Sequence, residues 1–128
     1  MAELCFHEQV TLLAFSPLAT GLLTGKYQGG AVPEGSRMSI NADLGGRMGG
    51  VRTLDVATLY VEVARKHGID PVHMALAFTV QRPIAVSTIF GATTSAQLRQ
   101  ILDGADTVLS DEVLAELDEV NRAHPMPY

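Results

Sequence analysis

Residues 15–27 read FSPLATGLLTGKY, and they lead from an apolar segment into a loop with two glycines and a lysine. The apolar run from Val10 to Phe15 has the length of a strand, and Ser16-Pro17 ends it. A loop of this composition directly after a strand is typical of a ligand-binding loop. The stretch therefore predicts a binding loop at the end of a strand.

The length and composition of the chain indicate one modest domain or part of one. The chain has 128 residues, 47% of them hydrophobic, whereas a complete eight-stranded α/β barrel needs roughly 250 residues. Fourteen acidic against nine basic residues give a net charge of −5. This charge disfavours a general nucleic-acid binder or a protein that binds anionic membranes. Basic residues are expected to act only locally.

The single cysteine and the lack of a long apolar run indicate a soluble, cytoplasmic protein. Cys5 has no second cysteine to pair with, and a buried apolar role is favoured over a reactive thiol. No apolar run reaches the roughly 20 residues of a membrane-spanning helix, because Ser16-Pro17 and Gln81-Arg82-Pro83 interrupt the longest candidates. No signal-peptide pattern is found at the start of the chain.

Apolar periodicity predicts an alternating order of strands and helices. The expected elements are a helix end at 2–8, strands at 10–15 and 84–90, a long Gly-rich loop at 28–52, and helices from Thr53 to Lys66, from Asp70 to before Pro83, from the 93–95 cluster to Gly104, and from the 109–112 signal to before Pro125. Both strands are mostly apolar, which is typical of parallel strands buried on both faces. The order predicts an α/β fold.

Local signals set several of these helix boundaries. Thr53 is a candidate helix cap, and Gly68 supplies a left-handed stop to the same helix. Asp70 as the cap and Pro71 at the first helical position give a strong start signal for the next helix. The last helix is expected to turn four apolar residues inward, namely Val113, Leu114, Leu117 and Val120.

Two strands do not close a sheet. Each strand would leave one edge of unpaired backbone groups, which readily pair with another chain. We therefore expect the chain to be part of something larger, or to associate with itself through these edges.

Three familiar motifs fail on their spacing. Residues 45–50, GGRMGG, lack the G-x-G-x-x-G spacing of a dinucleotide-binding turn and follow no predicted strand. Residues 21–26 are one residue short of a P-loop, and Tyr27 stands where a magnesium-ligating Ser or Thr is needed. The four histidines are scattered and no paired-cysteine or H-E-x-x-H motif occurs, so no metal site is predicted.

Two places remain where the sequence favours ligand binding, and both follow a predicted strand directly. They are residues 16–26 together with Arg37, and residues 91–93 together with Gln97. The carboxyl ends of strands are where α/β-barrel proteins bind their ligands. The simpler alternative, on composition alone, is an ordinary helix cap and two solvated basic side chains on a loop.

An anion suits both places on physical grounds. Gly91 allows a ligand to approach the backbone closely, and the helix that follows offers unpaired N–H groups and the positive end of its dipole. Lys26 and Arg37 supply positive charge, and the guanidinium of Arg37 can bind a phosphate through two hydrogen bonds.

Four blocks of the chain match one known family in order and spacing. They are Phe15–Tyr27, Pro33–Arg37, Met74–Phe78 and Ile89–Leu98. Together they span nearly the whole chain, and they resemble the C-terminal part of the aldo-keto reductase family, in the branch of the Tas-like reductases and the potassium-channel β-subunits. The resemblance implies an NADP(H)-dependent oxidoreductase with a (β/α)₈ TIM barrel. This chain would hold the last two strands, the long loop after the seventh strand and the closing helices.

The family pattern and the physical argument point to the same cofactor-binding residues. The predicted set is Ser16, Pro17, Leu18, Gly21, Lys26, Arg37, Gly91, Thr93 and Gln97. The resemblance implies that the segment from Ser16 to Gly21 lies over the nicotinamide and pyrophosphate of the cofactor. Lys26 and Arg37 resemble residues that reach over its phosphates. By the same resemblance, Thr93 and Gln97 hold the adenosine 2′-phosphate and the adenine.

The chain departs from the family pattern in two respects. Gln100 and Ile101 stand where the family has an acidic residue and an asparagine that touch the adenine, so adenine contact is expected to be weaker or different. The family's catalytic tyrosine, lysine, aspartate and histidine belong to strands earlier than any in this chain. None of the three tyrosines matches that context, and Lys66 lies within a predicted helix. No catalytic residue is therefore predicted.

The sequence thus favours the cofactor-binding part of an NADP(H)-dependent aldo-keto reductase that is not catalytically competent alone. Its substrate in the full-length parent would be a small-molecule carbonyl compound. Two alternatives stay open: a non-catalytic module that binds a nucleotide or a partner protein, and a structural fragment that assembles by strand pairing. No nucleic-acid or membrane partner is expected.

Overall fold

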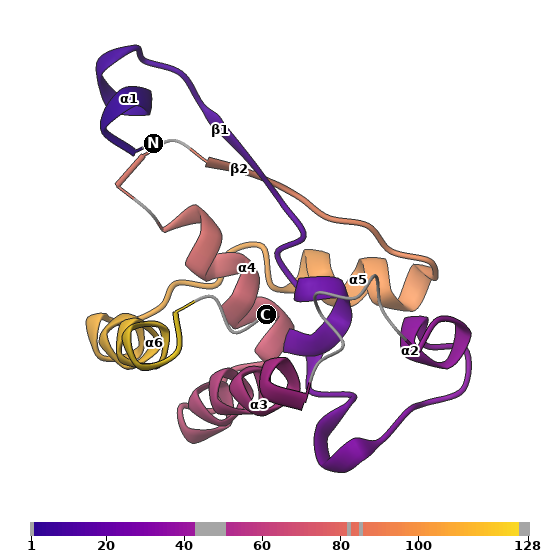
Figure 1. Ribbon diagram of the computed structural model, residues 1–128. Helices are drawn as coiled ribbons and strands as arrows, with labels where there is room; N and C mark the ends of the chain where they lie inside the picture. Colours follow the sequence, from indigo (N-terminus) through magenta and orange to yellow (C-terminus); the bar gives the residue numbers. More distant parts are fainter. Residues whose placement is uncertain (1, 43–50, 82, 85, 126–128) are drawn as a thin grey trace.

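The structure is a computed structural model, and it describes residues 2–42, 51–81, 83–84 and 86–125 (Figure 1). Its elements are α1 (Ala2–His7), β1 (Leu12–Phe15), the 3₁₀ segments η1 (Ala19–Thr24) and η2 (Gln28–Gly30), α2 (Arg37–Ile40), α3 (Val51–Lys66), α4 (Pro71–Val80), β2 (Val86–Ile89), α5 (Ser95–Asp103) and α6 (Asp111–Ala123). The predicted alternation of strands and helices is confirmed.

The two strands pair in parallel. Their register places Leu12 opposite Val86 and Phe15 opposite Ile89. The chain crosses from one strand to the other through α3 and α4, because parallel neighbours need a long connection. Figure 1 shows α1 at the far end of β1, away from helices α3 to α6. The carboxyl ends of both strands therefore lie at the same edge of the sheet, on the side of the helices.

One face of this sheet is exposed, so the prediction that both strands are buried on both faces is wrong. Leu13 and Phe15 are 61% and 80% exposed, and Ile89 on the other strand is 50% exposed. The opposite face meets α4, where the hydroxyls of Thr79 and Thr88 are hydrogen-bonded at 2.5 Å. An apolar strand sequence suits burial on one face or two, and the described helices cover only one of them.

Helices α3, α4 and α6 share a hydrophobic core. Its buried members are Val63, Ala64, Met74, Ala77, Leu109, Val113 and Leu117. The four residues predicted to turn inward from α6 are confirmed, two of them buried and the other two packed against this core. Burial of each large apolar side chain stabilises the fold by about 1.5–3 kcal/mol, so this core fixes α6 against α3.

The capping signals place three helix starts correctly. Asp70 Oδ1 accepts a hydrogen bond from the backbone N–H of Val72 at 2.7 Å, with Pro71 at the first helical position. The hydroxyls of Thr94 and Ser110 cap α5 and α6 in the same way. Each cap satisfies a backbone donor that the first helical turn leaves unpaired.

The two ends of α3 differ in how well the sequence predicts them. Gly68 follows the helix in the left-handed region, at φ 65°, as predicted. Thr53 is not a cap, because α3 begins at Val51 and Thr53 lies buried within it. The helix therefore begins two residues before Thr53, the polar residue that the sequence offers as a cap, and helix ends predicted from sequence often shift by this much.

The stretch at 28–52, predicted as one long loop, contains short helical segments. η2 and α2 lie within it, and α3 begins before its end. Ser36 caps α2 by accepting a hydrogen bond from the N–H of Ser39 at 3.3 Å. The Gly-rich motif at 45–50 lies outside the described residues.

Cys5 is buried, with 8% of its surface exposed, which confirms its predicted place as a small buried apolar residue.

Within the described ranges, no helix combines the length and apolar character that crossing a membrane requires.

Candidate functional site

The parallel register brings the two predicted binding places to one edge of the sheet. Because Phe15 lies opposite Ile89, the loop from Ser16 and the turn from Phe90 leave the sheet side by side. Figure 1 shows the chain passing from β1 into η1 and from β2 toward α5. This edge is where parallel α/β proteins place their ligands.

Hydrophobic contacts fix the first loop against three helices. Leu18 packs against a buried cluster formed by Val72, Leu76 and Ile101, which belong to α4 and α5. Leu22 is buried at 3% exposed and packs with Tyr27 and with Ala57 of α3; these three form a second cluster. The loop is therefore held in one position before any ligand arrives.

The backbone of this loop is strained at three positions. Ser16, Ala19 and Thr20 have φ angles of 56°, 46° and 58°, in the left-handed region that L-residues seldom adopt. Local hydrogen bonds hold the turn, including Ala19 N–H to Ser16 C=O at 2.9 Å and Gly21 N–H to Leu18 C=O at 2.8 Å. Conformations of this kind cluster at ligand-binding segments.

Lys26 folds back over the loop that carries it. Its ammonium lies 5.1 Å from the centre of the Tyr27 ring, within range of a cation–π interaction. A Cβ added at Gly21 would come within 3.2 Å of Lys26 Cε and Nζ, so the lysine passes directly over this glycine. The Tyr27 hydroxyl accepts a hydrogen bond from Met38 N–H at 3.3 Å and so connects the loop to α2.

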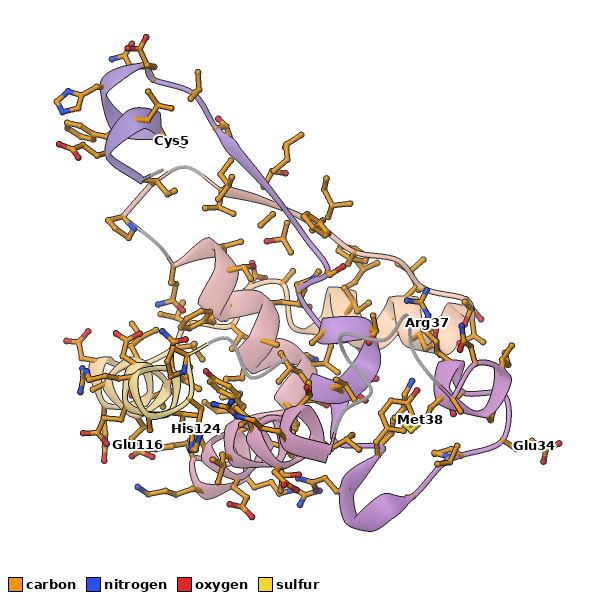
Figure 2. All side chains as sticks on the ribbon, in the orientation of Figure 1. Cys5, Glu34, Arg37, Met38, Glu116 and His124 are labelled. Carbon is orange, nitrogen blue, oxygen red and sulfur yellow. The ribbon has the colours of Figure 1, made fainter. Side chains whose placement is uncertain are left out.

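Arg37 begins α2 and is exposed (Figure 2). In the described part of the chain, the ion pairs involve Lys66 and His67 with Glu116. No acidic side chain of this part therefore neutralises Lys26 or Arg37. Arg37 thus has no acidic partner in this part of the chain, and Lys26 contacts the ring of Tyr27 in place of a carboxylate.

The structure also brings Thr93 and Gln97 together at the second place. The backbone N–H and the hydroxyl of Thr93 both donate to Gln97 Oε1, at 2.9 and 3.0 Å. The backbone N–H of Gln97 donates in turn to the Thr94 hydroxyl at 3.2 Å. All residues from Gly91 to Gln100 are exposed, and a Cβ added at Gly91 would meet nothing within 4 Å. The turn is thus open to a ligand.

The two places start from the same end of the sheet, and the first of them packs against α5 beyond the second. Among the described residues, no hydrogen bond or ion pair joins Lys26 or Arg37 to Thr93 or Gln97. Pro17 follows the strand end and is partly buried beside Ser16, which is exposed. The nine predicted residues lie on the two segments that follow the strands, on α2 and, for Gln97, in the first turn of α5. Leu18 of the first segment packs against an apolar cluster that includes Ile101 of α5.

The positions that depart from the family pattern have structural roles. Ile101 is 5% exposed and belongs to the apolar cluster under Leu18. Gln100 Nε2 donates to Asp70 Oδ2 at 3.0 Å, and Gln100 C=O pairs with His73 Nε2 at 2.7 Å. These bonds tie the start of α4 to α5 over about thirty residues of sequence, a separation that leaves no local signal.

A groove that no sequence pattern indicates lies between α4, β2 and α5, with a volume of about 280 Å³. Most of its lining is apolar, including Leu76, Val80, Val86 and Phe90. None of the nine predicted residues lines it. The groove is thus separate from the candidate site, although Phe90 directly precedes Gly91.

Residues 1–122 match the sequence profile described as the Aldo/keto reductase family. The chain is 42% identical over 127 residues to the protein named Protein tas of Escherichia coli (strain K12), and it covers 36% of that protein. It is 34% identical over 118 residues to a protein of Schizosaccharomyces pombe whose name describes a voltage-gated potassium channel subunit beta, and it covers 34% of that protein. The chain thus spans about a third of the length of these relatives.

A solved structure shows the same fold. A glycerol dehydrogenase from Gluconobacter oxydans aligns with all of this chain at a TM-score of 0.68, with 20% sequence identity, and 38% of that structure is covered. The two parallel strands and the helices described above are accordingly part of an α/β barrel. The fold predicted from the sequence is confirmed.

Proposed function

Because this chain belongs to the aldo/keto reductase family, we propose that it carries the cofactor-binding part of an NADP(H)-dependent oxidoreductase. The complete enzyme would reduce the carbonyl group of a small molecule to an alcohol, and the name of the family supports this reaction. The chain covers about a third of its relatives, so activity and substrate are proposed for the whole protein.

One observation carries this proposal: the register of the two strands. With Phe15 opposite Ile89, the basic loop and the open turn at Gly91 start from the same edge. Lys26 and Arg37 have no acidic partner among the described residues, and the turn leads into the N-terminus of α5. Positive charge and unpaired helix N–H groups together favour the phosphates of a dinucleotide.

We propose in addition that the chain alone does not catalyse hydride transfer. A catalytic tyrosine must reach the substrate and release its proton. Tyr27 is 4% exposed, with its hydroxyl bonded to Met38 N–H. Tyr60 lies on α3 and packs against the core that α3 shares with α4 and α6. Its burial raises the pKa of its hydroxyl, and the negative charge of Asp118 raises it further. Both environments oppose such a role, and Tyr128 lies outside the described residues.

A reducing, cytoplasmic setting belongs to the same proposal. The basis is the cysteine content, since Cys5 is buried and the sequence has no second cysteine with which to form an intrachain disulfide.

Titration of NADPH fluorescence against the purified chain tests the proposed binding. We expect saturable binding that Arg37→Ala weakens about tenfold or more, because a hydrogen bond to a charged group contributes about 1.5–3 kcal/mol. Thr93→Val keeps the shape of the side chain and removes its hydroxyl, so a smaller loss is expected. Arg122→Ala is the matched control, because it removes an exposed arginine of α6. Binding that ignores both site substitutions, or that Arg122→Ala weakens equally, contradicts the assignment.

A second function, self-association, is favoured by the exposed sheet face. Phe15 is 80% exposed and Leu13 61%, and side chains of this size are seldom left so open on a lone domain. We propose that this face and the free strand edges beside it pair with a second copy of the chain.

A further inference from the structure

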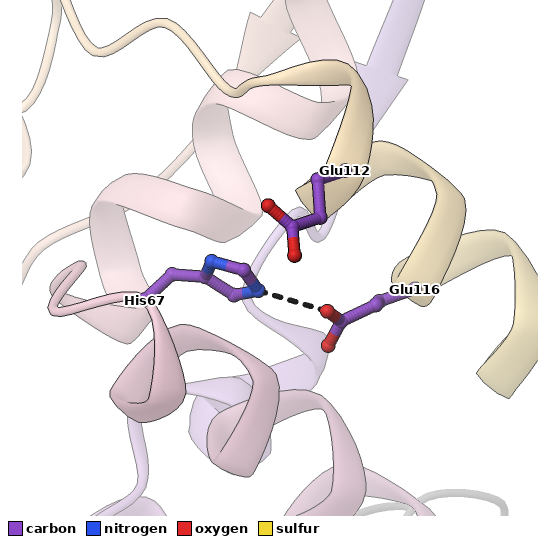
Figure 3. A group of neighbouring side chains, drawn as sticks. All are labelled: His67, Glu112 and Glu116. Atoms are coloured by element: carbon purple, nitrogen blue, oxygen red, sulfur yellow. Dashed lines mark hydrogen bonds and ion pairs between the residues drawn. The ribbon is translucent and has the colours of Figure 1, made fainter.

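His67, Glu112 and Glu116 converge on the outer side of the contact between α3 and α6 (Figure 3). His67 directly follows the last residue of α3, and the two glutamates are four residues apart on α6, which places them on one helix face. One ligand atom from each of the three side chains lies within 4.8 Å of the others. His67 Nε2 and Glu116 Oε1 are 3.0 Å apart.

The three side chains are held by packed structure. Val63, one turn before His67, is buried in the core, as are Val113 and Leu117, which directly follow the two glutamates. The core therefore fixes the spacing between α6, which carries the two glutamates, and the end of α3, where the N–H of His67 still donates to the C=O of Val63 at 3.3 Å. Sites built on packed helices keep their geometry better than sites on loops.

The environment suits an ion that keeps contact with solvent. The side chains of His67 and Glu116 are 17% and 22% exposed, whereas Glu112 is exposed. Metal sites in proteins often combine three protein ligands with one or more waters, and this arrangement leaves one side open for water.

The ammonium group of Lys66 already contacts Glu116 of this cluster. Lys66 Nζ lies 2.7 Å from the same oxygen of Glu116 that His67 contacts, and its side chain is 63% exposed. Exposed ion pairs of this kind are weak, and the long lysine side chain is free to turn into solvent. A divalent cation that binds two carboxylates and an imidazole has more to gain at this position than one ammonium group.

We propose that His67, Glu112 and Glu116 form a binding site for a divalent transition-metal ion, Zn²⁺ by its ligand chemistry, that joins α3 to α6. Zn²⁺ binds imidazole nitrogen and carboxylate oxygen together, whereas Mg²⁺ and Ca²⁺ prefer oxygen ligands alone. The ion would connect the end of α3 to α6, which pack through the core beneath it. The site does not depend on cofactor binding at the sheet edge.

Calorimetric titration of the purified 128-residue chain with Zn²⁺ tests this site. We expect one ion per chain, and a rise in the thermal unfolding midpoint when the ion is saturating. His67→Gln, Glu112→Gln and Glu116→Gln should each weaken binding about tenfold or more. Lys66→Met should strengthen binding, because it removes the competing ammonium.

Glu119→Gln is the matched control. It removes the same charge from the same helix near Lys66, but Glu119 is not part of the cluster. Equal weakening by Glu119→Gln, equal competition by Mg²⁺, or undiminished binding in a chain with all three ligands replaced would overturn the proposal. Circular dichroism of each variant establishes that it is folded, and a misfolded single variant leaves the other two to decide.

Discussion

At the scale of single residues, Gly21 determines whether the loop after β1 can keep its shape. Its φ angle is 97°, and the space where a Cβ would stand is within 3.2 Å of the Lys26 side chain. Any other residue there meets both a backbone cost and a steric one. The position of Lys26 above the loop thus depends on the absence of a side chain at Gly21.

We expect Gly21→Ala to destabilise the chain by about 1–2 kcal/mol, from the left-handed backbone alone, and to displace Lys26. Gly29→Ala is the comparison, because Gly29 also has a positive φ but nothing within 4 Å of its added Cβ. Urea unfolding measures the stability of both, and NADPH titration measures the effect on the loop. Equal loss of NADPH affinity in the two variants would contradict the role of the Gly21–Lys26 contact.

At the scale of elements, Asp70 serves two helices with one carboxylate. Oδ1 caps α4 through the Val72 N–H, and Oδ2 accepts from Gln100 of α5. We expect Asp70→Ala to cost about 0.5–2 kcal/mol of unfolding free energy, the usual range for loss of an N-cap. Asp70→Asn keeps the Oδ1 acceptor and should recover most of this loss. Urea unfolding decides, and an Asn variant as unstable as the Ala variant would argue against the cap.

Helix starts were predictable from the sequence because the signals that set them are local. Asp70, Thr94 and Ser110 each bond a backbone N–H two or three residues ahead, so the residue type and its place before an apolar run are sufficient. The same signal at Thr53 gives a wrong helix start, because the residue type alone does not indicate that the helix has already begun at Val51.

Contacts between distant segments gave no such signal. The pairing of His67 with Glu116 joins positions 49 residues apart, and no spacing in the sequence indicates that they meet. The candidate cofactor site was predictable to the extent that it rests on loops following strands, and the Thr93–Gln97 pair is within one helical turn. The packing of Leu18 against the cluster that contains Ile101 follows only from the folded chain.

At the scale of the whole molecule, the exposed face of the sheet is the main departure from a closed domain. Leu13, Phe15 and Ile89 all lie on it. The sequence predicts that these apolar strands are buried on both faces. In the described part of the chain, helices cover only one of the two faces.

We expect the chain to self-associate at micromolar concentrations, and Phe15→Ser to weaken this association about tenfold or more, since a buried phenylalanine contributes about 1.5–3 kcal/mol. Phe6→Ser is the control, because Phe6 is 71% exposed on α1, off the sheet face. Sedimentation velocity over a concentration series measures both. A wild-type chain that stays monomeric throughout would refute the proposed pairing.

The bond pattern between Thr93 and Gln97 has a consequence for selectivity. Both donors of Thr93 already have an acceptor in the Gln97 carboxamide. An incoming ligand must take over these donors, so the number of hydrogen bonds stays the same and only their strength changes. A neutral hydroxyl gains little from this exchange, whereas a phosphate oxygen accepts stronger, charge-assisted bonds. The turn would then select for anionic ligands, because only an anion forms bonds to Thr93 strong enough to displace the Gln97 carboxamide.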